Sequence, residues 1–155
     1  MRILVSTVIT CSLMFAACGS KHPEPASNAA ASAPAAITEL QRIDIEVPNG
    51  EGVSQGQVAV VHYTGWLYDA HAADHKGKKF DSSRDHGQPF RFEVGAGNVI
   101  KGWDEGVQGM RVGGQRRLII PASLAYGSEE KGDGVIPANS PLVFDIELLA
   151  IEQPK

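Results

Sequence analysis

The chain has 155 residues, which is room for one domain with attached segments. Its formal net charge of -4 argues against a nucleic-acid partner, and its two cysteines exclude a multi-disulfide scaffold. The hydrophobic share of 43% and the charged share of 21% are typical of a globular protein rather than a disordered or collagen-like chain.

The N-terminus has the features of an export signal. Residues 3–17 are an uncharged run, shorter than the about 20 apolar residues of a membrane-spanning helix and typical of a signal peptide. Residues 15–18 (FAAC) resemble the lipobox of bacterial lipoproteins, with Phe15 in place of the preferred leucine. This resemblance predicts a signal peptide over residues 1–17, cleavage before Cys18, and lipidation of Cys18.

The lipobox resemblance also implies a location. Gly19 follows the cysteine where an aspartate would favour retention in the inner membrane, so we expect a lipid anchor in the outer membrane, facing the periplasm. Several acyl chains, each contributing about 0.8 kcal/mol per buried methylene, make such an anchor durable. The alternative is an ordinary secretory signal that is cleaved after Ala17 or slightly later and releases a soluble periplasmic protein.

Residues 18–36 are predicted to be a lipidated N-terminus followed by a disordered linker. The segment is rich in alanine, proline and serine and has no large apolar residue, so it cannot bury enough surface to fold. Pro23, Pro25 and Pro34 also interrupt any helix that the alanines would favour. A proline-motif ligand is the alternative, but the segment lacks the PxxP pattern.

The globular domain is predicted over residues 37–155. Alternating or β-branched apolar residues predict strands over residues 40–47, 57–63, 90–94, 115–120 and 142–151. Only residues 99–107 have apolar residues at helical spacing, with Asn98 as a candidate cap and Gly106 and Gly109 as stops. The fold class is therefore α+β: five to six antiparallel strands packed on one short helix.

Of three patterns that resemble catalytic or metal sites, the glycine-rich one is excluded and the other two are disfavoured. Gly95, Gly97 and Gly102 do not have dinucleotide-binding spacing, and a phosphate loop would need a lysine where Trp103 stands. The two histidines in residues 71–75 lie in a polar stretch, so a solvated loop is favoured over a metal site. A serine, acids and a histidine occur in residues 80–86, but no nucleophile elbow accompanies them.

Six sequence blocks resemble successive signatures of the FKBP-type peptidyl-prolyl isomerases. They occur in the family's order, and the resemblance covers essentially residues 40–152. The blocks are residues 61–65 (VHYTG), 79–85 (KFDSSRD), 99–107 (VIKGWDEGV), 125–127 (AYG), 135–137 (VIP) and 142–149 (LVFDIELL).

The resemblance implies a twisted antiparallel sheet wrapped around a short helix, and an apolar active-site pocket with Trp103 as its floor. It implies that Asp81 is the pocket's carboxylate and that the Ile100 backbone N–H and the Tyr126 hydroxyl donate hydrogen bonds to bound carbonyls. The catalytic residues carried over are Tyr63, Asp81, Trp103, Tyr126 and Phe144, and the substrate-binding residues are Phe80, Phe90, Val99, Ile100 and Ile136.

The implied reaction suits an aromatic pocket. Rotation about an Xaa–Pro bond crosses a barrier of roughly 18–20 kcal/mol because amide resonance must be broken. No bond is formed or cleaved, so we expect neither a cofactor nor a metal. The planar amide is more polar than the twisted transition state, so a dry cavity favours twisting while a few donors hold the flanking carbonyls.

The implied partners are proline-containing polypeptides, macrolide inhibitors and, through Cys18, a lipid bilayer. Two positions depart from the family pattern: His86 stands where many relatives have an arginine, and Asn98 where some have a glutamate. The segments 69–76 and 128–133 also differ, and we expect both to border the pocket. A long helical dimerisation arm is absent, which predicts a monomer. The competing interpretation is an FKBP-like binding module or chaperone with little isomerase activity.

Overall fold

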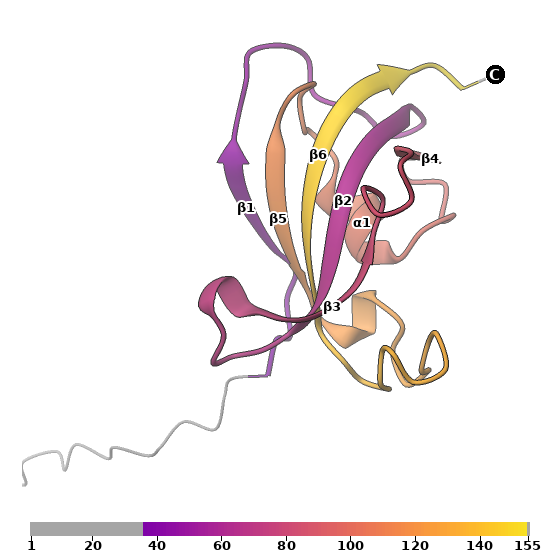
Figure 1. The fold of residues 1–155 in the computed structure, drawn as a ribbon. Coiled ribbons are helices and arrows are strands. Elements are labelled where there is room, and N and C mark those ends of the chain that lie inside the picture. The colour runs from indigo at the N-terminus through magenta and orange to yellow at the C-terminus, as the bar shows by residue number, and fades with distance from the viewer. Residues whose placement is uncertain (1–35, 155) are drawn as a thin grey trace, which may run out of the picture. The chain divides into compact units, whose positions relative to one another are not determined.

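The computed structural model describes residues 36–154, which form a six-stranded antiparallel sheet and one α-helix (Figure 1). The strand order is β1-β5-β6-β2-β3, and β4 pairs with β2 beside this path. The strands are β1 (Gln41–Glu46), β2 (Val58–Tyr68), β3 (Lys76–Ser82), β4 (Phe90–Glu93), β5 (Gln115–Ile120) and β6 (Leu142–Glu152). The helix is α1 (Lys101–Gly106), and 3-10 turns occupy Ala73–His75 and Ala122–Leu124.

The predicted fold class is confirmed: one twisted antiparallel sheet carries a short helix against one face (Figure 1). All five predicted strands are present, and β2 continues five residues beyond its predicted end at residue 63. Strand β3 is additional. Its sequence, KGKKFDS, has no apolar alternation, and its position at the end of the sheet leaves it partly exposed.

The predicted cap of the helix is wrong. Helix α1 begins at Lys101 with Ile100 as its N-cap, and no side chain caps it there. Asp104, from the first turn, accepts hydrogen bonds from the backbone N–H groups of Gly95 and Gly97 at 2.9 and 3.0 Å. The loop before the helix is therefore fastened by a side chain inside the helix rather than by Asn98.

The core lies between the sheet and α1. Strand β6 contributes every second residue from Leu142 to Leu148, each at most 3% exposed, as its alternating sequence indicates. Gly102 and Gly106 face β5, and a Cβ on Gly106 would lie 2.5 Å from a methyl carbon of Leu118. The two glycines therefore let α1 lie directly on the sheet, which sets the position of Trp103 between them.

A charged cluster on the opposite face ties three strands together. Asp145 of β6 accepts hydrogen bonds from Lys76 Nζ at 2.5 Å and from Arg117 Nε at 2.7 Å. Arg117 also pairs with Asp74 at 3.0 Å, and the Lys76 ammonium lies 4.3 Å from the Trp66 ring centroid. Because Lys76 belongs to β3 and Arg117 to β5, Asp145 connects both strands to β6.

The predicted signal peptide, Cys18 and linker residues 18–35 lie outside the described residues. Within residues 36–154, no helix is long and apolar enough to cross a membrane.

Candidate functional site

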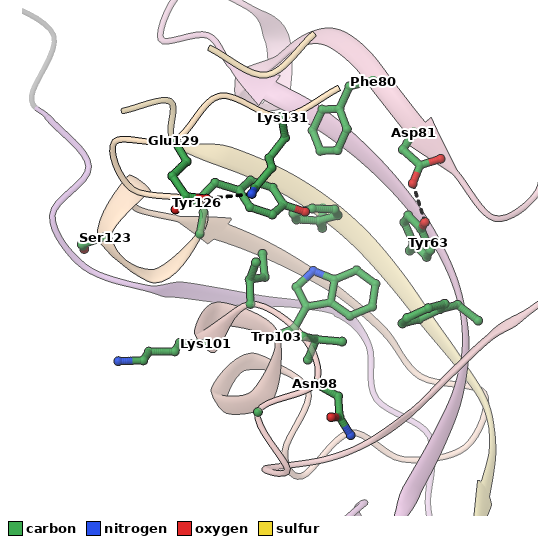
Figure 2. A pocket seen from close by; sticks show the side chains of 16 residues that line it. Tyr63, Phe80, Asp81, Asn98, Lys101, Trp103, Ser123, Tyr126, Glu129 and Lys131 are labelled. Atoms are coloured by element: carbon green, nitrogen blue, oxygen red, sulfur yellow. Dashed lines mark hydrogen bonds and ion pairs between the residues drawn. The ribbon is translucent and has the colours of Figure 1, made fainter. Parts of the chain in front are cut away.

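A cavity of about 750 Å³ opens between α1, the sheet and the long connection that precedes β6 (Figure 2). Its walls come from segments far apart in sequence, so the fold has to form before the cavity exists. The lining residues are Tyr63, Phe80, Asp81, Phe90, Gly97, Asn98, Val99, Ile100, Lys101, Trp103, Ser123, Ala125, Tyr126, Glu129, Lys131 and Phe144.

Trp103 forms the floor of this cavity and is 4% exposed. Three aromatic rings meet it edge to face: Tyr63 at 5.0 Å between centroids, Phe144 at 5.2 Å and Phe90 at 5.8 Å. Such T-shaped pairs contribute about 0.5–1.5 kcal/mol each beyond the area they bury. The indole Nε1 is buried and has no hydrogen-bond partner among the described residues. The floor is therefore aromatic, closely packed and, apart from the indole N–H, apolar.

The wall above the floor depends on a glycine of β2. Phe80 of β3 meets Phe144 of β6 edge to face at 5.6 Å. Gly65 lies against both rings: a Cβ there would be 2.6 Å from Phe80 Cζ and 2.7 Å from Phe144 Cε1. A side chain at Gly65 would therefore push these rings into the cavity.

The polar side of the cavity centres on Asp81. The Tyr63 hydroxyl donates to Asp81 Oδ2 at 2.5 Å, the contact drawn as a dashed line in Figure 2. His86 Nε2 lies 2.9 Å from Oδ1, which also accepts the Ser82 backbone N–H at 2.8 Å. Burial alone would raise the pKa of Asp81, but the hydrogen bonds from Tyr63, His86 and Ser82 bring it below its ordinary value. Asp81 is therefore an ionised acceptor.

Both cavity tyrosines keep their protons. Burial, and then the hydrogen bond to ionised Asp81, raise the pKa of Tyr63 far above its ordinary value. Burial is also the largest cause of the raised pKa of Tyr126, which the charge of Lys131 opposes and that of Asp81 reinforces. Tyr126 thus presents a neutral hydroxyl, which is a hydrogen-bond donor.

Tyr126 is held by the connection between β5 and β6. The Gly127 N–H donates to the Ala122 carbonyl at 2.8 Å, and the Asn139 N–H donates to the Gly127 carbonyl at 2.7 Å. Lys131 Nζ lies 5.8 Å from the Tyr126 ring centroid and pairs with Glu129 at 2.7 Å. Figure 2 shows this pair beside the tyrosine ring, at the mouth of the cavity.

The structure brings nine of the ten sequence-predicted site residues to the cavity. Ile136, the tenth, is 6% exposed, belongs to the hydrophobic core and does not line the cavity wall. Its backbone exchanges two hydrogen bonds with Lys131, each 3.0 Å long, so it fastens the connection that carries Tyr126 and Lys131.

Sequence reasoning did not select several of the lining residues. Glu129 and Lys131 lie in the segment 128–133, which was expected to border the pocket, but their pairing beside Tyr126 depends on the folded connection. Lys101 is at the first turn of α1, and Figure 2 shows its side chain pointing away from the Trp103 ring. The remaining ones are Gly97, Ser123 and Ala125, small or polar residues whose types give no signal of their own.

The residues of the disfavoured metal-site and hydrolase patterns make structural contacts. His75 stacks on Tyr68 with ring centroids 5.1 Å apart, and Asp74 is taken up by its ion pair with Arg117. Among the described residues, no group of three metal-ligating side chains comes together. Ser83, which contacts His62, is 2% exposed. Its Oγ lies 2.9 Å from His62 Nδ1 and accepts the Tyr63 backbone N–H at 2.9 Å, so it fastens β2 to the end of β3.

Comparison with known proteins gives a consistent result. Residues 50–149 match the family model described as FKBP-type peptidyl-prolyl cis-trans isomerase. The chain is 46% identical over 108 residues to the FK506-binding protein of Neisseria meningitidis serogroup C, covering 70% of this chain and 92% of that protein. It is 47% identical over 120 residues to FK506-binding protein 1A of Neurospora crassa, covering 75% and 93%.

A solved structure shares the fold. The crystal structure of FkpA from Escherichia coli superposes with a TM-score of 0.61 at 39% sequence identity. The match covers 75% of this chain and 49% of that one, so the chain spans about half the length of this neighbour.

Proposed function

Because the chain belongs to the FKBP-type peptidyl-prolyl cis-trans isomerase family, we propose that it catalyses Xaa–Pro rotation in exported proteins by desolvating the bond in the aromatic cavity. The observation that carries the mechanism is the cavity itself. Trp103, Tyr63 and Phe144 pack edge to face into a dry floor, while polar groups are confined to its sides.

The mechanism follows from the polarity of the amide. Uncatalysed rotation takes tens to hundreds of seconds, because the planar amide is stabilised by resonance. That resonance makes the planar form dipolar, and water stabilises the dipole more than it stabilises the twisted form. A proline ring seated on Trp103 takes the bond out of water, which lowers the free energy of the twisted state relative to the planar state.

We assign the orientation of the substrate to two hydrogen-bond donors. The Tyr126 hydroxyl keeps its proton, and Ile100 stands at the N-cap of α1, where helical N–H groups lack intrahelical partners. Hydrogen bonds from these groups to carbonyls on either side of the proline fix the flanking chain, so that rotation is confined to the one bond.

The Tyr126 hydroxyl gives the sharpest test of this mechanism. We expect Tyr126→Phe to lower kcat/KM about two- to tenfold, the loss of one hydrogen bond, in a proline-isomerisation assay. Tyr68→Phe is the matched control, because Tyr68 stacks on His75 outside the cavity, and its activity should equal that of the unmodified protein. Equal activity in the two variants would contradict the assigned role of Tyr126.

The same cavity is the proposed site for macrolide inhibitors. The relatives are named FK506-binding proteins, and the aromatic floor offers an apolar macrolide the same desolvated surface as proline. We expect FK506 to compete with the peptide substrate. Asn98 lines the cavity where some relatives carry a glutamate, so Asn98→Glu is expected to change the inhibition constant without abolishing catalysis.

The proposal includes export and lipid anchoring through Cys18. It is supported by the uncharged run 3–17 and the FAAC sequence that ends it. Expressed in a Gram-negative bacterium, the protein should incorporate labelled palmitate and fractionate with the outer membrane, and Cys18→Ser should lose both properties. Labelling that persists in Cys18→Ser would refute the anchor, and an unlabelled periplasmic protein would favour the ordinary secretory signal.

A monomer is the proposed state of the isomerase domain. Sedimentation of the protein should give the mass of one chain.

A further inference from the structure

On the polar side of the cavity, three hydrogen-bonded side chains lead from the floor to the solvent. Tyr63 packs on the Trp103 floor, its hydroxyl binds Asp81 Oδ2, and Asp81 Oδ1 binds His86 Nε2. The His86 side chain is 67% exposed and that of Asp81 39%. These three side chains thus connect a solvent-exposed imidazole directly with the floor of the cavity.

Asp81 and the two tyrosines keep one protonation state near neutral pH. The pKa of Asp81 lies below its ordinary value, whereas those of Tyr63 and Tyr126 lie above theirs. Asp81 is therefore charged and both phenols are neutral over the whole physiological range. Histidine is the side chain whose charge ordinarily changes between about pH 5 and 8.

Three other ionisable side chains, from β2, β3 and the turn after β3, contact other partners. Lys79 of β3 pairs with Asp85 at 2.8 Å, and Arg84 pairs with Glu147 of β6. His62 of β2 is engaged by Ser83. Besides Tyr63, His86 is the ionisable side chain that the structure places in contact with the Asp81 carboxylate, and this contact is an ion pair when the imidazole is protonated.

We propose that His86 is a positioning residue of the isomerase, whose positive charge holds Asp81 against Tyr63 and so makes catalysis depend on pH. A hydrogen bond between two charged groups is roughly twice as strong as one between neutral groups. Protonated His86 therefore restrains the carboxylate, and the carboxylate restrains the Tyr63 ring against the floor. As the pH rises, His86 loses its charge, and Asp81 and Tyr63 gain freedom to leave the positions that substrate needs.

The expected effect is modest because His86 is exposed. Exposed ion pairs correspond to changes of about two- to fivefold in an equilibrium constant, so kcat/KM should fall by about that factor as the pH rises from about 5.5 to 8.5. Because the restraint orders the empty cavity, the change should appear mainly in KM.

The test is a pH profile of kcat/KM with the full chain in detergent and a proline peptide that has no titrating group in this range. We expect the unmodified protein to lose activity as the pH rises. His86→Arg keeps a permanent positive charge, so its kcat/KM should not vary with pH and should equal that of the unmodified protein at low pH. The kcat/KM of His86→Gln should also not vary with pH, but should equal that of the unmodified protein at high pH. His71→Gln, an exposed histidine away from the cavity, should retain the profile of the unmodified protein.

A second measurement assigns the change of kcat/KM with pH to one residue. The ring resonances of His86, followed by NMR, should titrate with the same midpoint as kcat/KM. Different midpoints, a step that persists in His86→Arg, or equal activity of His86→Gln and the unmodified protein at every pH would each overturn the inference. If His86→Gln fails to fold, His86→Arg and the NMR midpoint still show whether His86 causes the pH dependence of kcat/KM.

This inference rests on the proposed catalytic function, and the two fail differently. An unmodified protein that is inactive at every pH would overturn the function. An active protein with a flat profile would overturn only the role of His86.

Discussion

Gly65 shows how one residue without a side chain shapes the cavity. Its Cα faces the rings of Phe80 and Phe144, with room for a hydrogen but not for a methyl group. We expect Gly65→Ala to cost about 1–3 kcal/mol of unfolding free energy by overpacking. It should also lower kcat/KM by more than its loss of stability explains, because the displaced rings belong to the cavity wall.

The control for Gly65→Ala is a glycine that has space around it. Gly56 has φ +83, and a Cβ added there would meet no other part of the protein within 4 Å, so Gly56→Ala should cost about 1 kcal/mol of backbone strain. Urea unfolding measures both costs, and the isomerase assay separates them. Equal activity per folded molecule in the two variants would show that Gly65 has no role in shaping the cavity.

The resemblance of six sequence blocks to one family predicted most of the cavity. That resemblance implied that Tyr63, Trp103 and Phe144 lie together although they belong to different elements. It did not distinguish Ile136, which is in the core, from a wall residue, because an isoleucine serves either place equally well. The sequence did not predict the pairing of Lys131 with Glu129 beside Tyr126, because that pairing depends on the path of the connection between β5 and β6.

At the scale of elements, the loop between β4 and α1 depends on Asp104. This carboxylate accepts the N–H groups of Gly95 and Gly97, and the residues that follow, Asn98 to Ile100, line the cavity. Asp104→Ala leaves both donors unpaired, at a cost of about 1–3 kcal/mol.

We therefore expect Asp104→Ala to raise KM more than it lowers kcat, since the loop that lines the cavity loses its anchor. Steady-state isomerase kinetics measure the two constants. Glu105→Ala, one position along on the exposed side of α1, is the matched control and should change neither. A KM for Asp104→Ala within error of the control would contradict the anchoring role.

The free energy of unfolding depends on pH through Asp145, the carboxylate that joins three strands. Burial alone would raise the pKa of Asp145, but the hydrogen bonds and charges of Arg117 and Lys76 bring it below its ordinary value. A carboxyl with a lowered folded-state pKa stabilises the fold above its unfolded pKa of about 3.9. That stabilisation is lost as the pH falls through the folded value.

Asp145→Asn should therefore cost about 1–2 kcal/mol at neutral pH, and the cost should shrink as the pH falls below about 4. Urea unfolding at several pH values measures this. Asp85→Asn is the control, because the Lys79–Asp85 pair is exposed and should contribute little at any pH. A cost for Asp145→Asn that does not vary with pH would refute the assigned role.

Strand predictions succeeded where the side chains alternate in polarity, even in the exposed strand β1, and missed β3, which other contacts hold. In β6 the alternation of apolar and acidic residues marks its buried and exposed faces. In β1 the same alternation is present, yet Ile43 and Ile45 are 44% and 51% exposed, because β1 is an edge strand that the helix does not cover. Strand β3 is held by its pairing with β2 and by Lys76, neither of which local sequence shows.

For the whole molecule, the sequence predicted the architecture because six blocks occur in the order of one family. The fold explains their spacing: the sheet brings β2, β3, β4 and β6 around Trp103, and the connection before β6 closes the remaining side with Tyr126. The details that distinguish this chain, such as the His86 contact and the charged pair at the mouth, are side-chain geometry. They required the structure.

The most direct test of the account is the rate at which the purified protein interconverts the cis and trans forms of a peptide with a single Xaa–Pro bond. We predict a rate that rises in proportion to enzyme concentration and is lowered in Tyr126→Phe but not in Tyr68→Phe. A folded protein that binds the peptide yet leaves the rate at that of buffer would contradict catalysis and favour a binding module.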